Sequence, residues 1–484
     1  MQRKHDEILI ELAHQAMIDR GLRPQFGHDV RQQLDAIDHP ARPDASARDL
    51  RHYGWCSIDN DDSRDLDQLT WGEDAGNGRT RIFIAVADVD ALVEKNTPID
   101  EHAQHNTTSV YTAAKVFSML PEKLSTDLTS LNEGEDRMAM VVEMIVDEDG
   151  RHHEEDVYRA LVHNHAKLAY DRVAAWLDGE EDEPAGLRNV DGLADSLRLQ
   201  DRTADAMRQL RHENGALDLE TIESRPVIRD GQVVELAQSR RNNARLLIED
   251  FMIAANGVMA RFLARHRVPS IRRVVRSPER WDRIERIAED LGDRLPPEPD
   301  AVALEQFLLR QKKFDPVRFP DLSLSIVKAM GAGEYVVEEP GDKPAGHFGL
   351  AVRDYTHSTA PNRRYPDLIT HRLVKAALAQ QRVPYSIDEL ARLAEHCTDQ
   401  EDAANKVERQ VSKSAAACML ASRVGESFDG IVTGASSKGT WVRVFNPPVE
   451  GKVVRGEKGL DIGDRVRVKL LKADVERGHI DFAR

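Results

Sequence analysis

Cysteine is scarce in this sequence. Its three cysteines, Cys56, Cys397 and Cys418, are scattered over 484 residues and form no CxxC pair. A zinc site built from cysteine pairs and a disulfide framework are therefore both excluded. The composition suits a reducing compartment such as the cytosol.

Long apolar runs and an excess of positive charge are also missing. No run reaches the ~18 apolar residues of a membrane span, and the N-terminal stretch "MQRKHDEILIELAHQ" carries charges inside its apolar part, unlike a secretory signal. We therefore expect a cytoplasmic protein without a membrane partner. The net charge of −17 argues against indiscriminate binding of polyanions, although local basic surfaces remain compatible with it.

The hydrophobic pattern changes twice along the chain and predicts an α+β protein of three domains. Residues 1–50 hold two amphipathic helices and a linker, and form either a helix-turn-helix nucleic-acid-binding unit or a packing element. Residues 51–423 predict a mixed α/β domain. Its strongest signals are two apolar strands and two long helices, at Thr80–Val93, Met138–Gly150, 240–266 and 386–422.

Residues 424–484 predict a five-stranded β-barrel of the OB type, because short alternating strands are separated by glycine turns. From residue 425 on, this segment holds eleven Lys or Arg and nine Asp or Glu, so it is slightly basic in an acidic chain. A barrel of this charge can follow a phosphate backbone and stack bases on aromatic side chains. Phe428 is expected in the core, whereas Trp441 is either a core residue or an RNA-stacking residue.

Five aspartates crowd the stretch "SIDNDDSRDLDQLTW" from Ser57 to Trp71. Asp65 and Asp67 are two residues apart, so on an extended segment they point to the same face. A turn between them and Asp59 can bring all three carboxylates together. Their mutual repulsion would be relieved by a hard divalent cation such as Mg²⁺. The alternative is a solvated acidic turn without a ligand.

A second polar cluster lies in "YTHSTAPNRRYPDLITHRL", from Tyr355 to Leu373. Arg363 and Arg364 directly precede a helix that Pro366 can open. A guanidinium pairs well with two phosphate oxygens. Together with a metal cluster, these arginines indicate phosphoryl chemistry, in which they neutralise the charge that the metal does not reach.

These segments together resemble the RNase II (RNB) family of exoribonucleases. The resemblance covers roughly residues 53–484. It rests on the acidic stretch and on further blocks in the same order as in the family, among them "IAVADVDALVEKNTPIDEHAQHNTTSVY", "SMLPEKLSTDLTSLNEGEDRMAM", "GALDLE", "LLIEDFMIAANGVMA" and "YTHSTAPNRRYPDLITHRL". The C-terminal barrel resembles the RNA-binding OB domain with which these enzymes usually end.

The resemblance implies stepwise hydrolysis of single-stranded RNA from the 3′ end, with release of nucleoside 5′-monophosphates and one or two Mg²⁺ ions. It assigns metal binding and catalysis to Asp59, Asp65 and Asp67, and cleavage to Arg363. It also implies RNA contacts, and these are assigned to Tyr111, Glu249 (with its neighbour Asp250 as the rival), Arg364 and Trp441. "IRRVVR" at Ile271–Arg276 is either part of a basic RNA path or a salt-bridged strand.

Gln68 departs from the family pattern, which usually closes the acidic box with two adjacent aspartates. An amide oxygen can bind Mg²⁺ or water, but it carries no charge and cannot act as a base. This leaves a second hypothesis, an RNA-binding protein of the same fold with little or no activity. Asp61 or Asp62 could compensate for the missing charge. A smaller departure is Ala360, where the family commonly has serine.

The N-terminal segment is the other departure. Family members often carry two small cold-shock barrels before the catalytic domain, and about fifty helical residues cannot hold them. We therefore expect a differently built RNA entrance that lets duplex RNA approach closely, so that 3′-tailed structured RNA joins single-stranded RNA as a possible substrate. The resemblance also leads us to expect a monomer.

Overall fold

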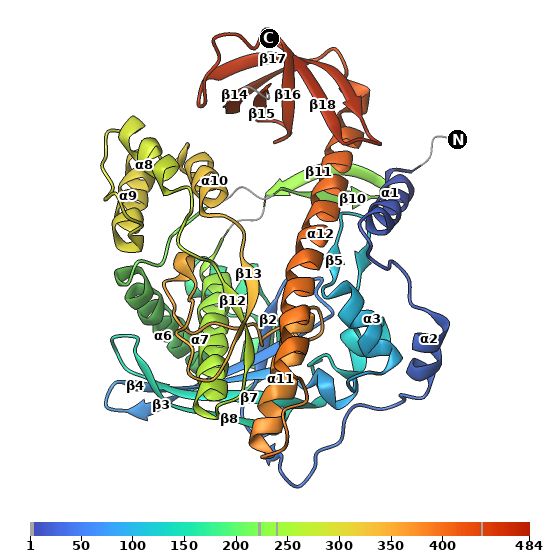
Figure 1. The fold of residues 1–484 in the computed structure, drawn as a ribbon, viewed down its shortest axis with the longest axis vertical. Helices are drawn as coiled ribbons and strands as arrows, with labels where there is room; N and C mark the ends of the chain where they lie inside the picture. Colours follow the sequence, from blue (N-terminus) through green and yellow to red (C-terminus); the bar gives the residue numbers. More distant parts are fainter. Residues whose placement is uncertain (1–3, 221–223, 239–240, 437–438) are drawn as a thin grey trace.

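The computed structural model describes residues 4–220, 224–238, 241–436 and 439–484. A large α/β body carries a separate barrel at one end, and a single long helix runs between them (Figure 1). The mixed α/β domain and the closed five-stranded C-terminal barrel confirm the predicted fold class.

A seven-stranded mixed sheet forms the centre of the body, in the order β1-β8-β7-β4-β3-β2-β9. Its middle strands are apolar on both faces; β4, for example, reads RTRIFIAVA and is buried over its last six residues. A strand of this kind is stable only when both faces of the sheet are covered. The strands are β1 (Arg48–Asp49), β2 (Cys56–Asp59), β3 (Gln68–Gly76), β4 (Arg79–Ala87), β7 (Asp136–Val146), β8 (His152–His163) and β9 (Ala166–Ala169).

Helices and short hairpins surround this sheet. Helix α6 packs against β3 and β4, and α7 packs against β7 and β8. The side chain of Asn242 caps α7 by accepting from the backbone N–H of Arg245. The elements here are α3 (Pro98–Asn106), β5 (Val110–Tyr111), β6 (Val116–Phe117), α4 (Tyr170–Leu177), α5 (Ala185–Arg188), α6 (Leu193–Glu213), β10 (Ser224–Arg229), β11 (Gln232–Gln238), α7 (Asn243–Arg265), β12 (Ser270–Val274), β13 (Glu334–Glu338) and α11 (Tyr365–Leu378). Residue 240, where one predicted helix begins, lies outside the described residues.

Three helices form a smaller unit beside the sheet, with a core of their own around Trp281, Phe307 and Phe319. They are α8 (Trp281–Asp290), α9 (Ala301–Phe314) and α10 (Phe319–Met330). Figure 1 shows this unit projecting toward the same end of the molecule as the barrel.

Helix α12 (Ile387–Leu420) connects the body to the barrel and contacts both. Ser386 caps it by accepting from the backbone N–H of Glu389, the Ser-x-x-Glu arrangement of a capping box. The barrel closes in the order β14-β15-β16-β18-β17. Its strands are β14 (Ser427–Ser436), β15 (Gly439–Val444), β16 (Glu450–Arg455), β17 (Arg465–Asp474) and β18 (His479–Ala483).

The two N-terminal helices, α1 (His5–Asp19) and α2 (His28–Asp35), pack against different parts of the body. Helix α1 contacts α12 and β11, and α2 contacts α3. The apolar face of α1, with Leu9 and Met17, shares a core with Val407 and Val411 of α12. The structure therefore favours the packing alternative over a helix-turn-helix unit, because this apolar face is already buried.

Within the described residues, no helix is both long enough and apolar enough to cross a membrane. The predicted domain boundaries after residues 50 and 423 stay predictions.

Candidate active site

The acidic segment lies where strands β2 and β4 end and strand β3 begins. Strand β2 finishes at Asp59, a turn follows in which the Ser63 N–H donates to the Asn60 carbonyl at 3.1 Å, and β3 begins at Gln68. The ammonium group of Lys167, from β9, donates to the carbonyl oxygens of Ser63 at 2.6 Å and Asp61 at 3.2 Å. The turn is thus fixed by a strand about a hundred residues away.

Burial raises the pKa of two carboxyl groups in this segment, that of the buried Asp67 and that of the partly buried Asp59. Burial, opposed by nearby Arg363, raises the pKa of Asp67 to about 7. Burial and then the negative charge of Asp65 raise the pKa of Asp59 to about 6, against the influence of Arg363 and Lys167. Carboxyl groups with raised pKa values are common at functional sites, where they bind cations or exchange protons.

The arginine loop reaches the same point from the other end of the sequence. The backbone N–H of Asn362 donates to Asp67 Oδ1 at 3.0 Å, and Arg363 Nε lies 3.6 Å from Asp67 Oδ2. Asp367, in the first turn of α11, is buried and accepts from the Ala360 N–H and from Arg364, both at 2.8 Å. This anchor holds the loop that presents Arg363.

Tyr111 is the third component. Its hydroxyl donates to Asp65 Oδ2 at 3.0 Å, and its side chain is 41% exposed, so its ring is open to a ligand. The N–H of Ser109 donates to the carbonyl of Arg363 at 3.0 Å. The backbone next to Tyr111 is therefore bonded directly to the arginine loop, and the predicted site residues Asp59, Asp65, Asp67, Arg363 and Tyr111 lie together.

A metal ion fits this set of donors in part. Asp59 Oδ2 and Gln68 Oε1 are buried without a hydrogen-bond partner, and both are hard oxygens of the kind Mg²⁺ prefers. In the described ranges, however, no group of three or more His, Cys, Asp and Glu side chains is placed to hold a metal ion. An ion bound here would depend on the Gln68 amide and on water or substrate oxygens as further ligands. Asp61 and Asp62 are exposed on the turn and do not replace the missing charge.

Comparison with known sequences agrees with this arrangement. The profile of the RNB domain matches residues 47–380, and that of the RNase II-type exonuclease C-terminal S1 domain matches residues 426–484. The chain belongs to the RNB family. The resemblance drawn from its sequence blocks is thereby confirmed.

Several bacterial relatives match nearly the whole chain. Ribonuclease R 1 of Lactococcus lactis is 29% identical over 95% of this chain and 59% of its own length. Ribonuclease R of Escherichia coli is 30% identical over 94% and 59%, and that of Thermotoga maritima is 30% identical over 95% and 68%. The chain thus spans about three fifths of the length of the first two relatives.

Solved structures share the fold at lower identity. Mycoplasma genitalium RNase R in complex with ribose-methylated single-stranded RNA superposes with a TM-score of 0.88 at 23% identity, covering 98% of this chain and 78% of that one. Yeast Ssd1, a pseudonuclease, superposes with a TM-score of 0.71 at 17% identity, covering 91% and 55%. The RNB fold therefore occurs in a nuclease and in a pseudonuclease.

Glu249 and Asp250, the rival candidates in the RNB block on α7, have different surroundings. Glu249 is 42% exposed and accepts two 2.8 Å hydrogen bonds from Arg241. Asp250 is buried and paired with Arg208 at 3.0 Å and with Arg211. Glu249 is therefore the one available to a ligand, whereas Asp250 attaches α7 to α6.

The other two predicted RNA contacts, Arg364 and Trp441, have different surroundings. The guanidinium of Arg364 is directed into the protein, where it bonds to Asp367 and, at 3.4 Å, to Thr359. Trp441 lies half-buried on the barrel, with the Lys452 ammonium 5.7 Å from its ring centre. Contacts of both residues with RNA stay predictions.

Of the two alternatives for "IRRVVR", the structure supports the salt-bridged strand. Arg272 is buried against Glu338 at 2.7 Å, Arg273 binds Glu401 at 2.6 and 2.9 Å, and Arg276 pairs with Glu334 at 2.5 Å. These guanidinium groups are already neutralised by carboxylates.

Two residues beside the acidic turn, Arg245 and Tyr170, were not predicted from the sequence. Arg245 of α7 donates to Asn60 Oδ1 at 2.7 Å, and its guanidinium lies 4.5 Å from the ring centre of Tyr170. Burial raises the pKa of Tyr170, and the charge of Asp59 raises it further. No local motif marks these residues, because only the packing of α4 and α7 brings them to the turn.

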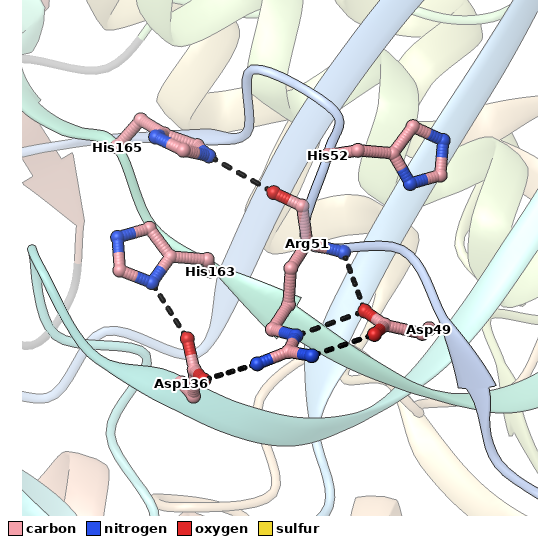
Figure 2. A pocket seen from close by; sticks show the side chains of 6 residues that line it. All are labelled: Asp49, Arg51, His52, Asp136, His163 and His165. Carbon is pink, nitrogen blue, oxygen red and sulfur yellow. Dashed lines mark hydrogen bonds and ion pairs between the residues drawn. The ribbon is translucent and has the colours of Figure 1, made fainter.

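Two sizeable cavities lie elsewhere. The cavity in Figure 2, of about 570 Å³, is at the β1–β8 edge and is lined by Asp49, Arg51, His52, Asp136, His163 and His165. Its charged groups pair with one another: Arg51 binds Asp49 and Asp136, and His163 binds Asp136 at 2.7 Å. A second cavity, of about 610 Å³, lies against α11. Neither is lined by a predicted site residue.

Proposed function

We propose that this protein is a Mg²⁺-dependent 3′→5′ exoribonuclease that hydrolyses single-stranded RNA to nucleoside 5′-monophosphates. One observation carries the proposal: Asp67, with its raised pKa, sits between the Asn362 N–H at 3.0 Å and the Arg363 guanidinium at 3.6 Å. Buried carboxylate oxygens can hold a divalent cation, and the guanidinium beside them can neutralise the negative charge that develops on a phosphodiester during hydrolysis.

The chain's own residues would divide the work as follows. Asp59, Asp65, Asp67 and Gln68 would contribute ligands to Mg²⁺ together with water or substrate oxygens, and the bound ion would supply positive charge for the phosphate and activate water. Arg363, 42% exposed, would neutralise the phosphate oxygens. Asp367 and Asn362 would keep Arg363 in place and are positioning residues.

Substrate binding would use the exposed groups around the acidic segment. Tyr111 would stack on a terminal base without reading its identity, a contact worth about 1–3 kcal/mol per base. Glu249 lies one helical turn beyond Arg245 and thus on the same side of α7. It would accept a hydrogen bond from a ribose 2′-hydroxyl, which distinguishes RNA from DNA.

The decisive experiment uses 5′-labelled single-stranded RNA. A ladder that shortens from the 3′ end should form with Mg²⁺, disappear with EDTA and disappear in the Asp67→Asn variant. RNA that stays intact with Mg²⁺ would refute the proposal. A 3′-tailed hairpin tests the wider substrate range: degradation should continue close to the duplex, and a stop far outside it would count against this part.

A second candidate function is an RNA-binding protein with weak or absent catalysis. The observation that favours it is Gln68, whose Oε1 is buried without a partner in the place of a carboxylate. The pseudonuclease with this fold shows that the fold does not require activity. Tight binding of RNA in EDTA together with no hydrolysis in Mg²⁺ would support this candidate.

A further inference from the structure

Three cations form an exposed row on strand β17 of the barrel. Residues 465–469 alternate strictly: Val466 and Val468 face the core, whereas Arg465, Arg467 and Lys469 face outward. Alternate residues of a strand are about 6.6–6.8 Å apart, a spacing comparable to that of consecutive phosphates in an extended single strand. In the part of the chain that the structure describes, none of the three side chains forms an ion pair.

The row continues across the sheet to an exposed aromatic residue. Arg467 lies opposite Asp429 of β14, and the Phe445 N–H donates to the Asp429 carbonyl at 3.0 Å, one residue beyond the Gly430–Val444 pair. Directly opposite residues share a face of the sheet. Arg467, Asp429 and Phe445 therefore lie side by side on the outer surface, and Phe445 is 51% exposed.

This surface, here called the β17 face (Arg465, Arg467, Lys469, Asp429 and Phe445), borders the three-helix unit. Arg443, two residues before Phe445, binds Asp321 of α10 through two hydrogen bonds of 2.9 and 3.1 Å. Gly463, just before β17, packs against the guanidinium of Arg318. The β17 face therefore lies beside α10, on strands β17 and β14. Trp441 belongs to a different surface of the barrel, because it pairs with Lys452 of β16.

Acidic groups near the β17 face are mostly engaged elsewhere. Asp464 accepts from the Asp461 N–H, Asp461 accepts from the Ile462 N–H, and Glu426 pairs with Arg423 at 2.9 Å. Asp429 is the one acid within the face. Unpaired cations beside an exposed aromatic ring are the combination with which proteins hold single-stranded nucleic acid.

We propose that the β17 face is a binding surface for the backbone of single-stranded RNA, separate from both the acidic site and the Trp441 surface. Arg465, Arg467 and Lys469 bind consecutive phosphates, and Phe445 stacks on a base between them. The inference rests on the proposed function for the identity of the polyanion as RNA. It adds to the barrel a second RNA-binding surface, which holds RNA that is too long to lie wholly within the body.

The test replaces all three cations with glutamine and measures binding of a 20-nucleotide single-stranded RNA in EDTA, so that no hydrolysis interferes. At about 0.1 M salt, affinity should fall about 10- to 100-fold. The negative slope of log affinity against log salt should become less steep by about 2, because three phosphate contacts are lost at ~0.7 each. The matched control is Lys472→Gln, an exposed lysine of the same strand that already pairs with Asp474 at 3.0 Å. It should leave both quantities unchanged.

Two further variants test the face itself. Phe445→Ala should weaken binding roughly fivefold or more through the lost stacking, whereas Asp429→Asn should strengthen it a few-fold, since it removes the negative charge that lies within the face. Stronger binding is a result that damage to the barrel would not produce. Unchanged affinity in the triple variant, or an equal loss in Lys472→Gln, would overturn the proposal.

Hydrolysis of a five-nucleotide RNA in Mg²⁺ separates this inference from the proposed function. The triple variant should cleave it at the parental rate, because so short a chain has no need of the barrel. If neither protein cleaves it, the proposed function fails, while the EDTA binding test still decides the role of the β17 face. Phosphatidylserine vesicles test whether the β17 face binds an anionic membrane instead of RNA. If the triple variant lost vesicle binding but kept its RNA binding, the assignment to RNA would be overturned.

Discussion

The acidic site and the β17 face handle charge in opposite ways. At the acidic site, Asp67 is buried and Asp59 is partly buried, and burial raises the pKa of both carboxyl groups despite the opposing charge of Arg363. On the β17 face, the cations are exposed and come from a single strand. Buried charges are suited to a ligand of defined geometry, whereas exposed charges are suited to a sliding contact that does not depend on sequence.

The largest expected effect comes from a change in the buried region. Asp67→Asn should lower RNA hydrolysis on the order of 10³-fold, since it removes a carboxylate next to both Arg363 and the candidate metal donors. Asp61→Asn is the matched control, because Asp61 is exposed on the same turn and should change the rate by less than twofold. Comparable losses in both variants would mean that the buried and exposed carboxylates do not differ in role.

The buried carboxylate of Asp367, which anchors the arginine loop, should also contribute to the stability of the fold. Asp367→Asn should lower the free energy of unfolding by about 2–4 kcal/mol, below the full value for a buried pair because Arg364 keeps 21% exposure. Urea unfolding measures it. The exposed pair Arg318–Asp315, at 3.6 Å, supplies the control Asp315→Asn, for which we expect less than about 1 kcal/mol. Equal losses of unfolding free energy in the two variants would show that the buried and the exposed ion pair stabilise the fold to the same extent.

Gln68 offers a way to sharpen the contrast within the site. Gln68→Asp should raise turnover up to about tenfold, or lower the Mg²⁺ concentration that is needed, because a charged ligand replaces an amide. Steady-state rates across a Mg²⁺ titration measure both. An unchanged or lower rate would show that the site has adapted to the amide.

The raised pKa values predict how the metal-free protein responds to pH. A carboxyl group with a pKa of about 7 in the folded state and about 4 when unfolded binds its proton more tightly in the folded state. Its contribution to stability is therefore gained as pH falls through 7 and lost as pH rises. In EDTA, Tm should be a few degrees higher at pH 5.5 than at pH 8. The difference should shrink in Asp67→Asn, and Mg²⁺ should raise Tm more at pH 8.

The smallest effect should come from the ion pair that joins the barrel to α10. Arg443→Gln should cost about 0.5–1 kcal/mol, since the pair with Asp321 is only partly buried. A double-mutant cycle with Asp321→Asn measures the coupling directly. A coupling above about 2 kcal/mol would show that this junction behaves like the buried site.

Much of the fold was predictable, because it depends on local patterns. The long helices at 243–265 and 387–420, the apolar strands and the barrel all lie where periodicity predicted them. The closeness of the acidic and arginine segments was not derivable from spacing. They are almost three hundred residues apart and meet through a hydrogen bond between Asn362 and Asp67; only the family resemblance joined them in advance.

Other parts of the site were beyond sequence reasoning for a related reason. Lys167 reaches the acidic turn because β9 pairs in parallel with β2, and Arg245 reaches it because α7 packs beside the sheet. Ion pairing bears on two open alternatives: Asp250 lies in an ion-pair cluster, and the arginines of 271–276 are paired with glutamates. A charge pattern does not reveal which partner each charge meets in three dimensions.

Helix α12 gives these two regions a common frame. At about 1.5 Å per residue, its 34 residues form a stiff rod on the order of 50 Å long. It carries the barrel at one end, and about two thirds of the way toward that end the carboxylate of Glu408 accepts from the backbone of Tyr111 at 2.7 Å. For RNA bound as proposed, this fixed separation would set a minimum length of chain that can contact the acidic site and the β17 face together. An RNA shortened below that length would lose its contact with the barrel first.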